Sequence, residues 1–363
     1  MKKFSFILAP LLVTLVLMLQ IIELIHWKRV DLYSPSGDEP HYLVMASGLF
    51  KYQTFEQSQA YAQEIQKKEI YRAGLSEQDM IGHTIKGPHG SFNIHNIGLP
   101  LLISIPYAVG GVIGAKAFMS VIASLVVFLQ WRISGVTGLG VTPRLLSVLA
   151  VGLCPCILAG GTQIYPDILA GLLILYPISL ISLPDNIKER RHVLFMALSI
   201  SLLPWIQIKY AAASVILMFA AILKVARKGH ATKGIYLVIM IWTTSMSCLA
   251  WYNLFAFGKA SGPYGNGALE LSSNSLMVLF GLLIDQNQGF LMQNPINFIG
   301  LLYFVPFILN EPRRGVLWLL ILGSLLLPNA MHPAWYGGWS FVGRFGWSFW
   351  VAFSAISIYG ILN

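Results

Sequence analysis

The sequence consists mainly of apolar runs that are long enough to cross a lipid bilayer as helices. A spanning helix needs about 20 predominantly apolar residues, and the first such run extends from Phe4 to Ile25. Nine further runs, several of them short enough to need tilt or local thinning of the bilayer, lie at 113–131, 145–162, 166–184, 192–206, 208–226, 235–257, 296–309, 315–330 and 346–361. The sequence therefore predicts an all-α, polytopic membrane protein with about ten transmembrane helices in a single domain over residues 1–363.

Composition supports this prediction. Hydrophobic residues make up 56% of the chain and charged residues only 11%, which is too apolar for a water-soluble domain with a polar surface. The formal net charge of +9 does not indicate a nucleic-acid partner, because the lysines and arginines lie in short gaps between apolar runs. The three cysteines all lie inside apolar segments, so neither a disulfide framework nor a zinc site with paired ligand spacings is indicated.

The positive charges predict which ends of the helices face the cytoplasm. Basic residues occupy every second gap, at positions 132 and 144, 188–191, 224–233, and 313–314. The positive-inside rule places these gaps in the cytoplasm together with the N-terminus. Counting 97–113 as a crossing would invert every later loop, so we interpret this proline-containing and glycine-containing stretch as a juxtamembrane or re-entrant helix.

Four segments are then external: a long first loop at 26–112 with juxtamembrane helices, a turn near Asp167, and loops at 258–295 and 329–344. The first loop carries adjacent carboxylates, Asp38 and Glu39, followed by His41. Such a pair suits a general base or a divalent-cation ligand. Alternatively, Asp38 caps a helix that starts at Pro40 and Glu39 lies in its first turn, with no chemical role.

Two further charged residues lie at junctions between apolar runs. Asp167 begins a run, where an aspartate is usually a helix cap, although the predicted topology brings it to the same face as Asp38. Lys209 lies between two apolar halves. It either extends to the outer headgroups or binds a phosphate group.

The last two candidate segments lie in the predicted external loops. Asp285, Gln286 and Asn287 offer many hydrogen-bond donors and acceptors, which suit sugar hydroxyls or a phosphate, but they also fit an ordinary solvated turn. The aromatic segment at 335–341 fits an interfacial belt. Arg344 follows it, at the mouth of the last helix, where a guanidinium can bind a phosphate or diphosphate through two hydrogen bonds.

Together these segments resemble the membrane glycosyltransferases of the GT-C superfamily, in particular the branch with the protein O-mannosyltransferases and the lipid A aminoarabinose transferases. The resemblance covers most of the chain and rests on five short motifs in the same order. These are Asp38-Glu39, the segment from His95 to Leu102, Asp167, the stretch from Asp285 to Gly289, and the Gly-Arg-Phe sequence that ends at Phe345.

The resemblance implies inverting transfer of a sugar from a polyprenyl-phosphate donor to a lipid, glycan or protein acceptor at the outer face of a bacterial-type cytoplasmic membrane. Asp38 would be the general base or a metal ligand, and Glu39 and Asp167 would orient the acceptor or complete a cation site. Arg344, with Lys209 as a second candidate, would neutralise the donor phosphate. The expected substrate-binding residues are His41, His95, Asp285, Gln286 and Asn287.

The resemblance requires no cofactor, and a divalent Mg²⁺ or Mn²⁺ ion at Asp38, Glu39 and Asp167 is compatible with it. Two other functions stay open. One is a lipid or solute transporter or flippase, which also uses intramembrane acids, although its site should lie near the midplane between two related halves. The other is a catalytically inactive, truncated relative. Many relatives continue beyond the arginine motif, whereas this chain stops at Asn363, so it is either a compact member of the group or a truncated, inactive one.

Overall fold

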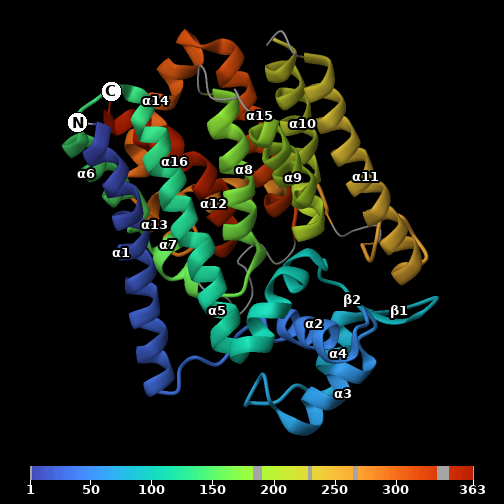
Figure 1. The fold of residues 1–363 in the computed structure, drawn as a ribbon. Helices are drawn as coiled ribbons and strands as arrows, with labels where there is room; N and C mark the ends of the chain where they lie inside the picture. Colours follow the sequence, from blue (N-terminus) through green and yellow to red (C-terminus); the bar gives the residue numbers. More distant parts are fainter. Residues whose placement is uncertain (1, 183–189, 228–230, 265–268, 333–342, 363) are drawn as a thin grey trace.

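The computed structural model describes residues 2–182, 190–227, 231–264, 269–332 and 343–362 (Figure 1). These residues form a bundle of helices and one small β hairpin. The predicted aromatic segment at 335–341 lies outside the described residues, as do parts of the basic gap at 188–191 and of the loop at 258–295. The bundle helices are α1 (Lys2–Arg29), α5 (Gly98–Ser134), α6 (Val141–Gly152), α7 (Pro155–Leu158), α8 (Pro166–Ser182), α9 (Arg190–Ile206), α10 (Ala211–Ala226), α11 (Ala231–Phe257), α12 (Ser273–Ile284), α13 (Phe290–Gln293), α14 (Asn297–Asn310), α15 (Pro312–Ala330) and α16 (Trp347–Leu362).

Where the structure describes them, the predicted apolar runs are largely helical, but fewer helices than expected are long enough to span a bilayer. Among the described residues, five candidate spans meet that length and hydropathy, and a sixth is added if α6 and the following 155–162 segment, bent by 65°, form one span. Apolar helices α8, α12 and α14 are shorter. The described residues therefore show an all-α membrane protein with five or six candidate spans rather than clearly ten, because several runs are short or are interrupted by proline and glycine.

The outer surface of the bundle is apolar, as expected for a protein in contact with lipid. Leu11, Met18 and Ile22 of α1 are exposed, as are Met240 and Trp251 of α11. Apolar surface of this extent is unfavourable in water, whereas it matches the hydrocarbon core of a membrane. In contrast, α16 is buried along most of its length and packs against α8 and α14.

The predicted first external loop folds into a small region at one end of the bundle, the lower end in Figure 1. It contains α2 (Glu39–Tyr52), α3 (Ser58–Lys67), α4 (Glu77–His83) and the antiparallel strands β1 (Thr84–Gly87) and β2 (Gly90–Asn93). The start of α1 and the end of α16 lie at the opposite end of the bundle (Figure 1). The hairpin is fixed against α11: a Cβ on Gly87 would lie 1.7 Å from the carbonyl oxygen of Ala256, so only glycine fits there.

Helix α5 is broken in its first half. Gly110 and Gly111 have non-helical backbone angles, and Gly111 has a φ of 57°, which favours glycine. The residues before the break lie beside the first-loop region, and those after it run along α1 (Figure 1). The stretch at 97–113 therefore does not form a separate candidate span but leads, through a bend, into the predicted 113–131 helix.

Candidate functional site

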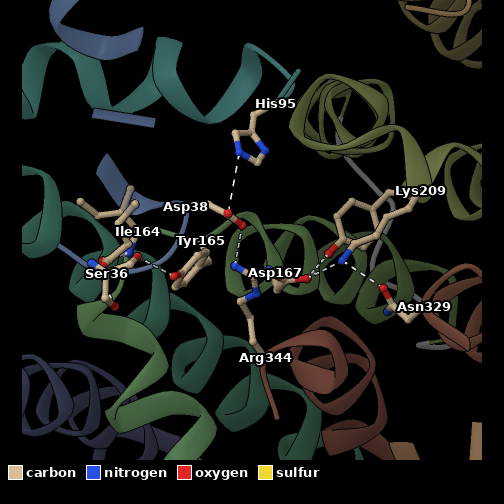
Figure 2. A network of polar contacts seen from close by, with 11 residues as sticks. Ser36, Asp38, His95, Ile164, Tyr165, Asp167, Lys209, Asn329 and Arg344 are labelled. Atoms are coloured by element: carbon tan, nitrogen blue, oxygen red, sulfur yellow. Dashed lines mark hydrogen bonds and ion pairs between the residues drawn. The ribbon is translucent and has the colours of Figure 1, made fainter. Parts of the chain in front are cut away.

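Three buried or half-buried carboxylates at this end of the bundle each contact a cation from a distant segment, and Figure 2 shows two of these pairs, Asp38 with Arg344 and Asp167 with Lys209. The three ion pairs are Asp38 with Arg344 at 3.0 Å, Glu39 with Lys116 at 2.9 Å, and Asp167 with Lys209 at 2.8 Å. All the charged residues that the sequence suggested for catalysis and phosphate binding thus lie in one network, whereas Lys116 was not predicted. An apolar helix such as α5 gives no sequence signal that its one buried lysine faces a carboxylate.

Asp38 occupies the N-cap position of α2, but its side chain makes no capping hydrogen bond. Instead, Oδ2 accepts a hydrogen bond from Nη1 of Arg344, and Oδ1 lies 4.0 Å from Nε2 of His95. The side chain retains 30% of its exposure. The sequence allowed Asp38 to be either a helix cap or a residue with a chemical role. The geometry argues against the cap, because the carboxylate contacts Arg344 and not the backbone of its own helix.

Arg344 lies in the short 3₁₀ turn that leads into α16, and its side chain is only 9% exposed. The guanidinium lies over the ring of Tyr165, 4.2 Å from the centroid, which restricts it to one plane. Its Nε is buried and has no hydrogen-bond partner among the described residues. Since one arm of the guanidinium contacts Asp38 and Nε is unpaired, Arg344 retains donor capacity for a further oxygen ligand.

Lys209 points into the protein rather than toward the lipid headgroups. Its ammonium group donates to Asp167 at 2.8 Å and to Oδ1 of Asn329 at 3.2 Å, and its side chain is 12% exposed. Asp167 also accepts a hydrogen bond from the hydroxyl of Tyr210. Asn329 donates to the carbonyl oxygen of Phe345, so it joins Lys209 to the turn that carries Arg344. Neither Asn329 nor Tyr210 was predicted from the sequence.

Glu39 serves a different purpose from its neighbour Asp38. Its Oε1 accepts hydrogen bonds from Lys116 and from the backbone N–H of Ile164, and Oε2 accepts from the N–H of Ser36. Both Glu39 and Lys116 are 2% exposed. Glu39 therefore ties the first loop to α5 and to the segment before α8, and both of its oxygens are occupied within the protein.

A second group of titratable side chains adjoins Asp38. His95 lies beside it, and His83 stacks on His41 with ring centroids 3.5 Å apart. His41 itself shares a hydrogen bond with the hydroxyl of Tyr61 at 2.6 Å. His83 was not predicted, because it lies at the end of α4, where a histidine is ordinary, and only the hairpin brings it to His95.

The local electrostatics keep Asp38 ionised. Burial raises the pKa of Asp38, but the charges of His95 and Arg344 outweigh this effect and bring it to about 2. Burial lowers the pKa of His95 to about 4, and burial together with the charges of its histidine neighbours lowers that of His41 to about 3. His95 therefore carries its charge only below about pH 4, where Asp38 itself begins to titrate, and at neutral pH Arg344 is the charged partner in direct contact with the Asp38 carboxylate.

The side chain of Asp285 is hydrogen-bonded within its own turn. Oδ1 of Asp285 accepts from the backbone N–H groups of Asn287 and Gln288, both at 2.8 Å, an aspartate-stabilised turn. Within the described part of the chain, no hydrogen bond joins Asp285, Gln286 or Asn287 to Asp38, Asp167 or Arg344. The next residue, Gln288, connects the segment to the turn before Arg344, because its Oε1 accepts from the N–H of Gly343 at 2.7 Å.

The segment that begins at His95 positions the turn before Lys209. The amide of Asn96 donates to the carbonyl of Pro204 and accepts from the N–H of Ile208. A Cβ on Gly98 would lie 2.5 Å from the carbonyl oxygen of Trp205. This close approach of α5 to the end of α9 explains the glycine at position 98, and it orders the chain just before Lys209.

The three carboxylates do not fit a shared Mg²⁺ or Mn²⁺ site. Such a site needs several oxygens that converge on one point. Here Glu39 is engaged by Lys116 and backbone donors, and Asp167 by Lys209 and Tyr210. A cation held jointly by Asp38, Glu39 and Asp167 would have to displace both lysines.

Comparison with known proteins establishes the fold. No protein-family model matches this chain, and no curated protein sequence matches it. The crystal structure of ArnT from Cupriavidus metallidurans in the apo state aligns with 100% of this chain at a TM-score of 0.59 and 11% identity. The two proteins share a fold. The chain spans 59% of the length of that ArnT chain. At 11% identity the likeness shows a shared fold and nothing more.

Proposed function

We propose that this protein is a membrane glycosyltransferase that transfers a sugar from a polyprenyl-phosphate donor to a lipid, glycan or protein acceptor. The observation that carries the proposal is the direct contact between Asp38, a carboxylate with a free face, and Arg344, a guanidinium with unused donors. The fold likeness to ArnT, a GT-C aminoarabinose transferase, supports it, as do the motifs in the sequence.

In the proposed reaction Asp38 accepts the proton of the acceptor hydroxyl. The acceptor oxygen attacks the anomeric carbon, and the bond from that carbon to the donor phosphate breaks with inversion. The phosphate leaves with the bonding electron pair. Arg344 neutralises its charge, and Lys209 is the second cation near its path. A phosphate leaving group needs this charge stabilisation more than it needs protonation.

The ion pair of Asp38 and Arg344 is the resting arrangement in this scheme. A carboxylate with a pKa of about 2 is a weak base. When the donor phosphate binds, it competes with Asp38 for the guanidinium, and the pKa of Asp38 rises toward its ordinary value. Donor binding therefore makes the base more effective when the acceptor is to be deprotonated.

Glu39 and Asp167 act by positioning in this proposal, since each is bound to a buried lysine. The proposal also retains the full predicted topology, in which the shorter helices cross with tilt, about ten crossings occur, and both chain ends face the cytoplasm. The end of the bundle that carries Asp38 then faces outward from a bacterial-type cytoplasmic membrane, where polyprenyl-linked sugars are available.

The test is transfer of radiolabelled sugar from polyprenyl-phosphate donors to endogenous acceptors in membranes that contain the wild type or Asp38→Asn at matched levels. We expect transfer by the wild type and its loss in the variant. Undiminished transfer in Asp38→Asn would reject Asp38 as the base. No transfer from any donor by correctly inserted wild type would favour a transporter or an inactive relative.

A further inference from the structure

A compact group of metal-binding side chains lies on the side of Asp38 that faces away from Arg344. Asp38, His83 and His95 each present one ligand atom, and these atoms lie within 4.8 Å of one another. Figure 2 shows His95 directed at Asp38. The three residues come from the start of α2, the end of α4 and the segment after β2, so the group forms only in the folded protein.

Both imidazoles are held in orientations that suit ligation. One ring nitrogen of His83, Nδ1, lies 2.9 Å from the carbonyl oxygen of Asp79. Metal-bound histidines commonly donate their second ring nitrogen to such an oxygen, which fixes the ring. The Nε2 atom of His95 is buried and has no hydrogen-bond partner among the described residues. A buried ring nitrogen without a partner is unfavourable, and a metal ion would satisfy it.

The hairpin fixes the separation of the two histidines. His83 directly precedes β1, His95 lies two residues beyond β2, and Thr84 pairs with Asn93 in the register. The N–H of Ile94 donates to the carbonyl oxygen of His83, and the N–H of His95 donates to the side chain of Asn93. The backbone on both sides of the group is thus hydrogen-bonded before any ligand arrives.

Two imidazoles and one carboxylate form a donor set typical of zinc and neighbouring transition metals rather than of Mg²⁺ or Ca²⁺, which take oxygen ligands. We propose that Asp38, His83 and His95 bind one zinc-type transition-metal ion. His41 is not a ligand in this site, because its Nδ1 is engaged with Tyr61 and its ring stacks on His83. The proposal does not depend on sugar transfer.

The test uses the full-length protein, purified in detergent with an affinity tag that lacks histidine and stripped with a chelator. Zn²⁺ or Co²⁺ alone is then added, and bound metal per chain is measured by mass spectrometry after removal of free ion. We expect about one ion per chain, as for a three-ligand site. His83→Ala and His95→Ala should bind the ion at least about tenfold more weakly, because loss of a group that merely supports a ligand already weakens metal binding by about that factor. The matched control is His89→Ala, an exposed histidine at the tip of the same hairpin.

Because a ligand variant can also fail to fold, X-ray absorption of the zinc-loaded wild type provides a second measurement. We expect imidazole nitrogen and carboxylate oxygen in the coordination shell. The proposal is overturned if monodisperse wild type binds no stoichiometric Zn²⁺ or Co²⁺, if folded His83→Ala and His95→Ala retain full affinity, or if the bound ion shows no imidazole. Metal binding without transfer would instead refute only the proposed function, and transfer without metal binding would refute only this site.

Discussion

Arg344 donates a hydrogen bond to Asp38 over 3.0 Å, although 306 residues separate them in the sequence. The contact joins the start of the first helix beyond α1 to the turn before the last helix, so two segments from opposite ends of the sequence meet at one point. A partly exposed carboxylate and a buried guanidinium thereby share one small site. Four predictions follow from the contacts around it.

Arg344→Lys should reduce transfer strongly. Lysine keeps the positive charge but loses the planar fork that contacts Asp38 and stacks on Tyr165. Loss of one preorganised donor typically lowers turnover by about 10²-fold to 10³-fold, which steady-state transfer rates in membranes would reveal. Arg72→Ala is the control, because Arg72 pairs with Asp31 on the exposed surface and is 60% exposed. Equal loss in both variants would mean that surface charge, not the site, is responsible.

Lys116→Met should lower the stability of the folded protein strongly, because Lys116 is buried. It leaves the Glu39 carboxylate buried without its cation, a change that typically costs about 3–5 kcal/mol. The double variant Lys116→Met/Glu39→Gln should recover part of this loss. Thermal unfolding in detergent is the measurement, with Lys51→Ala as the control. Lys51 and Glu69 form a partly exposed pair, and such pairs contribute about 1 kcal/mol or less.

Gly98→Ala should be poorly tolerated, because its Cβ would lie 2.5 Å from the carbonyl oxygen of Trp205. Overpacking of this kind costs about 1–3 kcal/mol, and it would displace the turn that carries Lys209. Gly110→Ala is the matched control on the same helix, since no atom lies within 4 Å of its Cβ position. Equal melting temperatures for the two variants would contradict the described contact between α5 and α9.

Chelation should lower the melting temperature of zinc-loaded wild type, because an ion that binds only the folded state stabilises it by mass action. His89→Ala should respond in the same way. His95→Ala should melt at the same temperature with and without chelator. A chelator response of equal size in His95→Ala would place the bound ion elsewhere in the protein.

The apolar pattern of the sequence predicted most of the helices, but it did not predict which residues of different helices contact one another. Apolar runs identified every bundle helix except α12 and α13, because helix formation in apolar segments depends on local residues. The described residues contain five or six candidate spans rather than clearly ten, since length and breaks such as the one at Gly152 to Pro155 decide whether a helix reaches across a bilayer. The ion pairs bring Asp38 to Arg344 and Asp167 to Lys209, whereas the side of the membrane that these residues face stays a prediction.

Individual contacts depend on packing that no local pattern records. Lys116 lies in an apolar helix, and its partner Glu39 is 77 residues earlier. His83 reaches Asp38 only through the register of the hairpin. The amide-rich Asp285 segment was predicted to bind substrate, and that role stays a prediction, because its carboxylate is engaged with its own turn.

The pairing of each carboxylate with its own cationic side chain also affects how a charged ligand would reach the site. Asp38, Glu39 and Asp167 are balanced by Arg344, Lys116 and Lys209, so the three pairs add to zero formal charge. A neutral cluster creates little potential beyond its immediate surroundings, and it cannot attract an anion from the distant solution. A lipid-anchored anion does not need such attraction, since it reaches the protein by lateral diffusion within the bilayer. Its rate of capture should therefore depend weakly on ionic strength.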